Sequence, residues 1–431
     1  MLTELVKKFE NNFGLKNGDD PLESAKRMVN NIQAVVGIRN VFGDKKIKRY
    51  TLTSVLLLII FPGGFLYMAQ LSQFAHLIQV LPNKAKSFQA MNCYSSTWVP
   101  LSKFIFMWFS SDRLKTITDL SRQGMQTLPP GSAQNAMRQV LQKARLVSWL
   151  VILNQVLTHF LYLFLPLFMT IINNKRYLPT TPGHIFGFPP LKYVSPYYEM
   201  SFMVIIFSSV FSAANQTGYI VLFVTLLSHE LGHFNAICET LNDVHKIIEA
   251  NDKRKPNTID IGTSDDQIID ETEPLPLKNE IDKEKQIEKM LKFCVKHHQF
   301  IFRLHEKICQ LYKAIFGAHF LIMVIVLVTT LQTLNSWGLI NTLLTGVTGI
   351  MPLMVYCFGG ELLITASAEM SHAAYSCGWQ GMNVNYSRIV YLILSLSQKP
   401  LYYTAAGIFI MNHETFGDVA QVVYKIYAVF N

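Results

Sequence analysis

The chain has 431 residues, of which 50% are hydrophobic, and its mean hydropathy of +0.24 is too high for an ordinary soluble domain of this length. The formal net charge is +9, but the basic residues lie between apolar runs instead of in one patch, which argues against a nucleic-acid-binding protein. The first 48 residues lack an apolar core followed by a cleavage site. We therefore expect no secretory signal peptide and expect the first apolar run to direct membrane insertion.

Ten lysine and arginine residues, from Lys7 to Arg49, precede the first long apolar run. Cytoplasmic segments of membrane proteins collect these two residues, so we expect residues 1–49 to form a cytoplasmic N-terminal segment. If seven spans follow, the C-terminus faces the outside. This orientation is the reverse of that of a G-protein-coupled receptor.

Five apolar stretches are long enough to cross about 30 Å of hydrocarbon, which takes about 20 helical residues. They are Tyr50–Leu71, Leu146–Ile172, Tyr198–Leu227, Ala314–Leu334 and Leu339–Ala366.

Two further stretches are weaker candidates. Lys84–Phe109 contains Lys86 and Lys103, so we expect it to pack against other helices. The stretch 401–430 is divided by polar residues 412–415, and we expect only Phe416–Phe430 to span the membrane. The sequence therefore predicts an all-α membrane protein with seven transmembrane helices.

The charges between the spans agree with an inner N-terminus. Residues 110–145 contain six Lys or Arg and residues 229–313 contain thirteen, whereas the three predicted outer segments together contain only Lys175, Arg176 and Lys192. The long inner stretch carries less weight, because the rule weakens for loops above about 60 residues.

The predicted cytoplasmic segments include helices that do not span the membrane. Apolar residues at helical spacing continue the fourth span to Ile248 and resume over Ile287–Tyr312, whereas 249–283 is expected to be a disordered acidic linker. We therefore divide the chain into 1–49, transmembrane helices 1–4 with an extension (50–248), the linker, helices 5–6 with anchor helices (284–400), and a final helix (401–431). Such a helical bundle could be an assembly interface or could pack only within the chain.

One motif suggests metal chemistry. His229, Glu230 and His233 match H-E-x-x-H, in which two histidines at i and i+4 bind zinc and the glutamate polarises a water molecule. No G-x-x-H continuation follows, and no third ligand is evident. A membrane zinc metalloprotease is thus an alternative, and a solvated, charged helix end is the favoured interpretation.

The C-terminal third resembles the insect odorant receptor family. The resemblance covers about residues 356–430, and the general layout covers the whole chain. It rests on Tyr356-Cys357-Phe358-Gly359-Gly360-Glu361-Leu362, Ala374-Tyr375-Ser376-Cys377-Gly378-Trp379, Ser397-Gln398-Lys399-Pro400, Thr404-Ala405-Ala406-Gly407, Glu414-Thr415-Phe416 and Val423-Tyr424-Lys425-Ile426-Tyr427.

The related gustatory receptors share this layout but typically carry Thr-Tyr and then Gln-Phe in the last span. Here Phe416 follows Thr415 and Val422 follows Gln421, and neither pair matches the gustatory pattern. A gustatory-type channel is therefore less favoured and is kept as an alternative. The family's coreceptor is longer and has a different last span, which favours a ligand-tuning subunit.

The resemblance implies four subunits around a central pore that the last span lines, joined by an intracellular anchor domain. It also implies assembly with the odorant receptor coreceptor, as a heterotetramer, into a ligand-gated cation channel for small volatile ligands. The expected location is the plasma membrane, in lipid, at sensory neuron dendrites. No cofactor and no enzyme activity are expected.

An odorant site is expected to be a small apolar and aromatic pocket with a few polar groups, between helices in the outer half of the membrane. The third span offers one polar face, which consists of Gln155, Thr158, His159 and Tyr162, beside Phe160 and Phe164. Further candidates lie on the second, fourth and sixth spans: Tyr94, Trp98, Phe202, Ile206, Ser209, Met351 and Met354. For each residue, packing is the simpler explanation.

The pore-facing side of the last span is expected to carry Tyr424, Tyr427, Ala428 and Asn431, which share a helix face. In the family the gate lies near the extracellular end, which corresponds here to Ala428–Asn431. Lys425 is unexpected in a cation pore and leaves the choice of face open.

Overall fold

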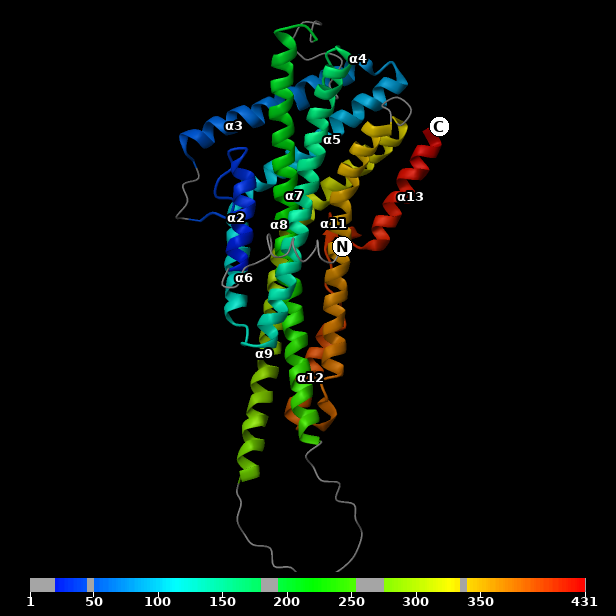
Figure 1. Cartoon of the computed structure of the whole chain (residues 1–431). Helices are drawn as coiled ribbons and strands as arrows, with labels where there is room; N and C mark the ends of the chain where they lie inside the picture. The colour runs from blue at the N-terminus through cyan, green and yellow to red at the C-terminus, as the bar shows by residue number, and fades with distance from the viewer. Residues whose placement is uncertain (1–19, 45–49, 180–192, 253–274, 334–338, 431) are drawn as a thin grey trace, which may run out of the picture.

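The computed structural model describes residues 20–44, 50–179, 193–252, 275–333 and 339–430, which form long helices and one short hairpin (Figure 1). The helices are α2 (Pro21–Ala34), α3 (Leu52–Phe65), the π-helix η1 (Leu66–Ser72), α4 (Gln73–Val80), α5 (Lys84–Phe109), α6 (Ser111–Gln126), α7 (Ser132–Asn173), α8 (Tyr197–Asp252), α9 (Leu275–Gln332), α11 (Leu339–Tyr375), the 3₁₀ turn η2 (Trp379–Gly381), α12 (Val384–Ser397) and α13 (His413–Phe430). The strands are β1 (Thr404–Ala405) and β2 (Phe409–Ile410).

The predicted all-α membrane fold is confirmed. Among the described residues, five helices are long and apolar enough to cross a membrane: Leu52–Val80, Ser132–Asn173, Tyr197–Ala250, Asp282–Gln332 and Thr345–Tyr375. The predicted second and seventh spans correspond to α5 and α13, whose polar and charged residues lower their hydropathy.

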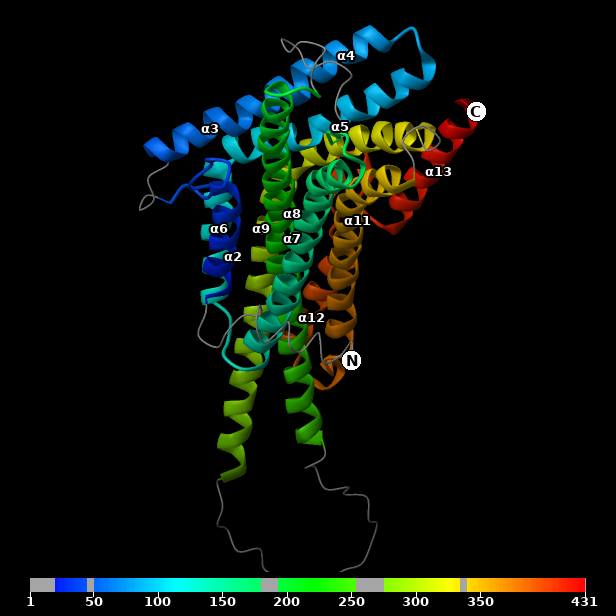
Figure 2. The same ribbon diagram turned by 45° about the horizontal axis from the view of Figure 1, so that its top comes forward.

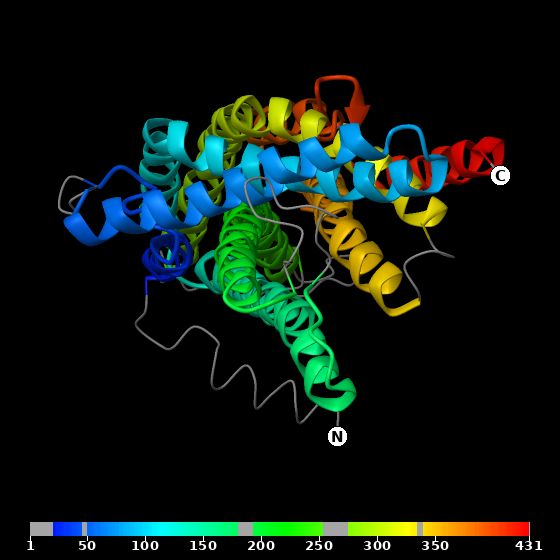
Figure 3. The same ribbon diagram turned by 90° about the horizontal axis from the view of Figure 1, so that it is seen from above.

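Helix α8 is the centre of the fold. It contacts α2, α3, α5, α7, α9 and α11, and 83% of its most apolar window is buried, against 6% for α7. Figure 3, which looks down on the molecule, shows α8 nearly end-on, with α3 and α4 passing along one side of it. The apolar residues of α7 therefore face outward, where lipid would cover them.

Helices α8 and α9 are too long to lie within a bilayer. Their 56 and 58 residues extend about 85 Å at 1.5 Å per residue, against about 30 Å of hydrocarbon. The excess forms the lower half of the molecule in Figures 1 and 2, together with α12 and the end of α11. We call residues 229–252, 284–313, 367–375 and 384–397 the lower bundle.

The predicted linker is partly helical. Its residues 253–274 lie outside the described part of the chain, whereas α8 continues to Asp252 and α9 begins at Leu275. Pro276 is the second residue of α9, a position where proline is tolerated because the missing N–H would have no partner in the helix.

Short polar residues set several helix starts. Thr51 and Ser54 form a reciprocal capping box at α3, and Asn83 Oδ1 accepts from the backbone N–H of Lys86 at α5. Asn412 Oδ1 accepts from Thr415 N at 2.9 Å and so fixes where α13 begins.

The hairpin β1–β2 precedes α13 and is held between two glycines. Ala406 N donates to the carbonyl of Lys313, and a Cβ on Gly317 would lie 2.7 Å from the Ala406 side chain. On the other side, a Cβ on Gly360 would lie 1.9 Å from the Met411 carbonyl oxygen. Only glycine allows α9 and α11 to approach the hairpin this closely.

Candidate ligand cavity

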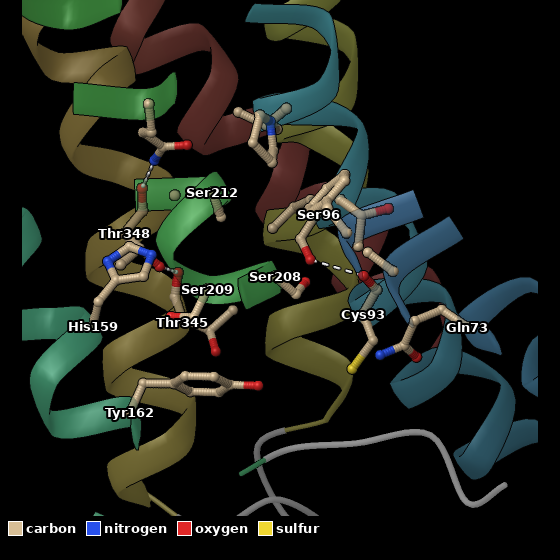
Figure 4. A pocket seen from close by; sticks show the side chains of 18 of the residues that line it. Gln73, Cys93, Ser96, His159, Tyr162, Ser208, Ser209, Ser212, Thr345 and Thr348 are labelled. Carbon is tan, nitrogen blue, oxygen red and sulfur yellow. Dashed lines mark hydrogen bonds between the residues drawn. The ribbon is translucent and has the colours of Figure 1, made fainter. Parts of the chain in front are cut away.

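A cavity of about 260 Å³ lies between the helices of the upper half (Figure 4). Six of the seven predicted spans contribute to it, and α13 does not. Its lining consists of Phe65, Met68, Ala69, Gln73, Asn92, Cys93, Ser96, Thr97, Val99, Pro100, Thr158, His159, Tyr162, Ile205, Ser208, Ser209, Ser212, Gln216, Met323, Val326, Thr345, Thr348 and Gly349.

Helix α8 presents one small and polar face to the cavity. Ile205, Ser208, Ser209, Ser212 and Gln216 recur at helical spacing, and Figure 4 shows the three serines on the same side of α8. Ser209 was among the predicted ligand-binding residues. Because serine is short, this face leaves open the space that a larger side chain would fill.

Helix α7 contributes most of its predicted polar face. Thr158, His159 and Tyr162 line the cavity, whereas Gln155 is 1% exposed and lies outside the lining. His159 Nδ1 lies 2.9 Å from the Gln155 carbonyl oxygen, which can only accept, so the neutral ring carries its proton on Nδ1.

Helix α5 faces the cavity with a different side from the predicted one. Asn92, Ser96 and Val99 line it, whereas Tyr94 and Trp98 lie on the neighbouring face. The Tyr94 ring packs at 6.2 Å from Trp98 and at 5.5 Å from Phe74 of α4. The aromatic signal on this span therefore marks helix packing.

The remaining predicted residues also lie outside the lining. Phe160 and Phe164 stack on each other at 4.3 Å, and both are about half exposed on the outer face of α7. Met354 is 41% exposed, and Met351 packs against the main core from a partly buried position. Phe202 and Ile206 are likewise partly buried on α8 and do not line the cavity.

Asn92 joins two walls of the cavity. Its Nδ2 lies within hydrogen-bond distance of three oxygens of α9, at 2.9 Å from the Val326 carbonyl, 2.9 Å from Thr329 Oγ1 and 2.8 Å from Thr330 Oγ1. A buried amide between membrane helices contributes through bonds of this kind. Asn92 was not among the predicted ligand-binding residues, although it lines the cavity.

Other lining residues were missed as well, chiefly Gln73, Ser96, Met323 and Thr348. A signal was available, because Ser, Thr and Gln are unfavourable in lipid and cluster where spans face one another.

Helix α13 packs on α9 and α11 through Val419 and Val423, which are 5% and 6% exposed. Of the predicted pore residues, Tyr424 is 67% exposed and Ala428 is exposed. The Tyr427 carbonyl accepts from Gln332 Nε2 at 3.2 Å. Asn431 lies outside the described residues.

Two residues of the H-E-x-x-H motif, Glu230 and His233, bind other side chains of the protein, whereas the buried His229 ring has no hydrogen-bond partner in the described structure. Glu230 accepts from the Tyr403 hydroxyl through Oε2, and its Oε1 lies 3.4 Å from His305 Nδ1. His233 Nδ1 lies 2.9 Å from His297 Nε2. The described residues contain no group of three or more His, Cys, Asp or Glu side chains that could hold a metal ion. The geometry gives the zinc protease alternative no support. The favoured interpretation, a solvated, charged helix end, is wrong, because all three side chains are fully buried in the interior of α8, where α9 and the segment before the hairpin pack against them.

Glu230 and His305 form a buried ion pair in the lower bundle. Desolvation lowers the pKa of His305, but the Glu230 carboxylate and the Cys309 thiol raise it more, to about 10. The same carboxylate and burial raise the pKa of Tyr403. This pair joins α8 and α9 to the segment that leads into the hairpin and α13.

Comparison with known proteins identifies the family. The family described as 7tm Odorant receptor matches residues 84–424. Odorant receptor 10a of Drosophila melanogaster is 29% identical over 148 residues, covering 33% of this chain and 36% of the relative. The odorant receptor coreceptor of Aedes aegypti is 26% identical over 152 residues, covering 34% and 32%. The aligned parts thus span about a third of these curated relatives.

The fold also matches a solved structure. The insect olfactory receptor OR5 from Machilis hrabei in complex with eugenol aligns with a TM-score of 0.66 at 14% identity, over 95% of this chain and 99% of that receptor. Because the family match covers most of the chain, the protein belongs to the odorant receptor family.

Proposed function

We propose that this chain is the odorant-binding subunit of a ligand-gated, non-selective cation channel in the plasma membrane of sensory neuron dendrites. The observation that carries the proposal is the cavity of about 260 Å³ within the apolar spans. A pocket of this kind between helices suits a small organic ligand. That a receptor of the same fold binds eugenol supports this assignment.

The partner in the proposed tetramer is the odorant receptor coreceptor. Its support is the similarity to the coreceptors of Aedes aegypti and Aedes albopictus. In the proposed orientation the N-terminus is cytoplasmic, as the ten basic residues before Tyr50 suggest. The lower bundle would then lie in the cytoplasm, and α13 would end outside.

The proposed pore side of α13 is the one with Tyr424, Tyr427, Ala428 and Asn431. The exposure of Tyr424 and Ala428 supports this choice, because α13 packs on the rest of the chain through a different side, that of Val419 and Val423. Helix α9 connects the cavity physically to α13. Val326 lines the cavity, and Gln332, six residues further, donates to α13.

Gating would then be a shift between two populations. A ligand opens the channel only if it binds the open arrangement of these helices more tightly than the closed one. The ligand's contacts with α9 supply this difference in affinity between the open and closed arrangements if α9 moves with α13.

Electrophysiology tests the proposal. Cells that express this chain with the coreceptor should give odorant-evoked cation currents in excised patches without nucleotides, and cells with either subunit alone should lack this odorant response. Absence of currents from correctly surface-expressed protein would contradict the proposal. Epitope tags should be accessible at the C-terminus, and not at the N-terminus, of unpermeabilised cells.

Cysteine substitution tests the pore side. Tyr424→Cys and Ala428→Cys should make the current sensitive to a charged thiol reagent, whereas Val423→Cys, one residue from Tyr424 but buried, should not. Equal sensitivity of all three variants would assign the pore to another side.

A further inference from the structure

The cavity excludes charged ligands. Among the described residues that line it there is no Lys, Arg, Asp or Glu. An ion moved into this site would lose its hydration without gaining a counter-charge, which is costly in an apolar region. Carboxylates and ammonium ions, the forms that acids and amines take at neutral pH, are therefore poor ligands.

Three polar side chains of the wall already use a proton within the protein and keep only an acceptor for a ligand. Ser96 Oγ donates to the Cys93 carbonyl at 2.9 Å, and Thr158 Oγ1 donates to the Asn154 carbonyl at 2.8 Å. Each hydroxyl has a single proton, so both oxygens are left with lone pairs only. His159 uses its Nδ1 proton on a carbonyl and keeps Nε2 as an acceptor.

Two buried polar groups at the cavity have no partner within the described structure. They are Gln73 Oε1 and Ser209 Oγ, and each side chain belongs to a residue that is 7% exposed. Figure 4 shows them on different walls, Gln73 on α4 and Ser209 on α8. A hydroxyl both donates and accepts, so it satisfies the Gln73 amide in either orientation and the Ser209 hydroxyl as well.

The volume limits the size of the ligand. A cavity of about 260 Å³ lies just below the range of about 300–1,000 Å³ that holds drug-sized ligands, so it suits a small molecule.

We propose that the ligands of this receptor are small neutral molecules with a hydroxyl group, alcohols or phenols, which bond to the unpartnered Gln73 and Ser209 side chains of the cavity wall. This inference rests on the proposed function and narrows it to one ligand class. Ethers, aldehydes and esters only accept hydrogen bonds, so they can satisfy the Ser209 hydroxyl but not the Gln73 carbonyl oxygen.

A series of ligands with one chain length tests the class. Wild-type receptor with the coreceptor is exposed to 1-heptanol, heptanal, 1-chloroheptane, heptanoic acid and heptylamine at pH 7.4, and the half-maximal concentration for current is measured. We expect 1-heptanol to act at about tenfold lower concentration than heptanal or 1-chloroheptane, the factor that one hydrogen bond supplies. The acid and the amine should act weakest.

Variants with a matched control assign the effect to the cavity. Ser209→Ala and Gln73→Leu should each reduce the advantage of 1-heptanol over 1-chloroheptane to about threefold or less. Ser201→Ala is the control, because Ser201 lies on α8, is 1% exposed and has an equally unpartnered hydroxyl, yet does not line the cavity. It should keep the full advantage.

The outcomes separate the inference from the function. If heptanal, 1-chloroheptane or an ionised ligand is as potent as the alcohol, the ligand class is wrong and the channel assignment stands. The class is equally wrong if both cavity variants keep the alcohol's advantage. If no volatile of any class opens a channel that reaches the surface with the coreceptor, the proposed function fails as well.

Discussion

Replacing Glu230 with glutamine is expected to destabilise the protein by about 4 kcal/mol at pH 7. Glutamine keeps an oxygen that accepts from Tyr403 but removes the charge that His305 faces at 3.4 Å. The buried imidazolium is then left without its counter-charge and either loses its proton or destabilises the fold.

The magnitude follows from the pKa of His305. The pKa is 6.5 for an unperturbed histidine and about 10 in the folded protein. The pH of 7 lies about three units below the pKa of His305 in the folded protein. Each unit corresponds to 1.36 kcal/mol, so the ion pair stabilises the folded state by about 4 kcal/mol. Loss of one partner from a buried ion pair generally costs about 3–5 kcal/mol, which agrees.

The sign of the pH dependence is also fixed. Because the folded pKa is raised, the stabilisation is complete below pH 6.5 and is lost as the pH rises through about 10. Thermal unfolding in detergent should therefore show a fall in Tm between about pH 6.5 and 10 for wild type, and Glu230→Gln should lack this step.

At pH 7 the variant should unfold roughly 8 °C lower, at about 2 °C per kcal/mol for a large domain. Glu239→Gln, a half-buried position nine residues further along α8, is the control and should unfold within about 2 °C of wild type. If Glu230→Gln behaves like this control, the ion pair does not stabilise the lower bundle.

Three further predictions concern the remaining contacts. Asn92→Leu should lower the stability by about 1 kcal/mol, since bonds between membrane helices contribute about 0.6 kcal/mol each and the two amide protons of Asn92 serve the three acceptors; an unchanged Tm would contradict this. Gly360→Ala should displace the hairpin, because the new Cβ would meet the Met411 carbonyl, whereas Gly346→Ala, with nothing within 4 Å, should be neutral in a surface-expression assay. Burial lowers the pKa of His297 to about 4. The contribution of the neutral ring to stability is therefore complete above pH 6.5 and is lost as the pH falls toward 4. His297→Phe should make Tm less dependent on pH over this acid range.

The sequence predicted the helices well because their signals are local. The predicted second span, Lys84–Phe109, coincides with α5, and Thr158, His159 and Tyr162 were correctly placed on a common face of α7. Hydropathy and spacing are properties of one helix alone, so no neighbour is needed to interpret them.

The direction in which a face points could not be derived in the same way. On α5 the cavity face is that of Asn92 and Ser96, and Tyr94 lies beside it. Phe160 and Phe164 were expected in the pocket but lie on the outer face of α7, where lipid accepts aromatic rings as readily as a pocket does. Spacing shows which residues share a face, and only the packing of several spans shows what that face meets.

The continuity of α8 has a consequence for how this receptor can change in evolution. Ser209 at the cavity and Glu230 in the ion pair lie on one unbroken helix. Each residue turns an α-helix by about 100°, so inserting or deleting one residue between these positions would turn one of the two sites away from its partners. Substitutions can adjust the cavity one side chain at a time, whereas changes in length between residues 209 and 230 should be eliminated by selection.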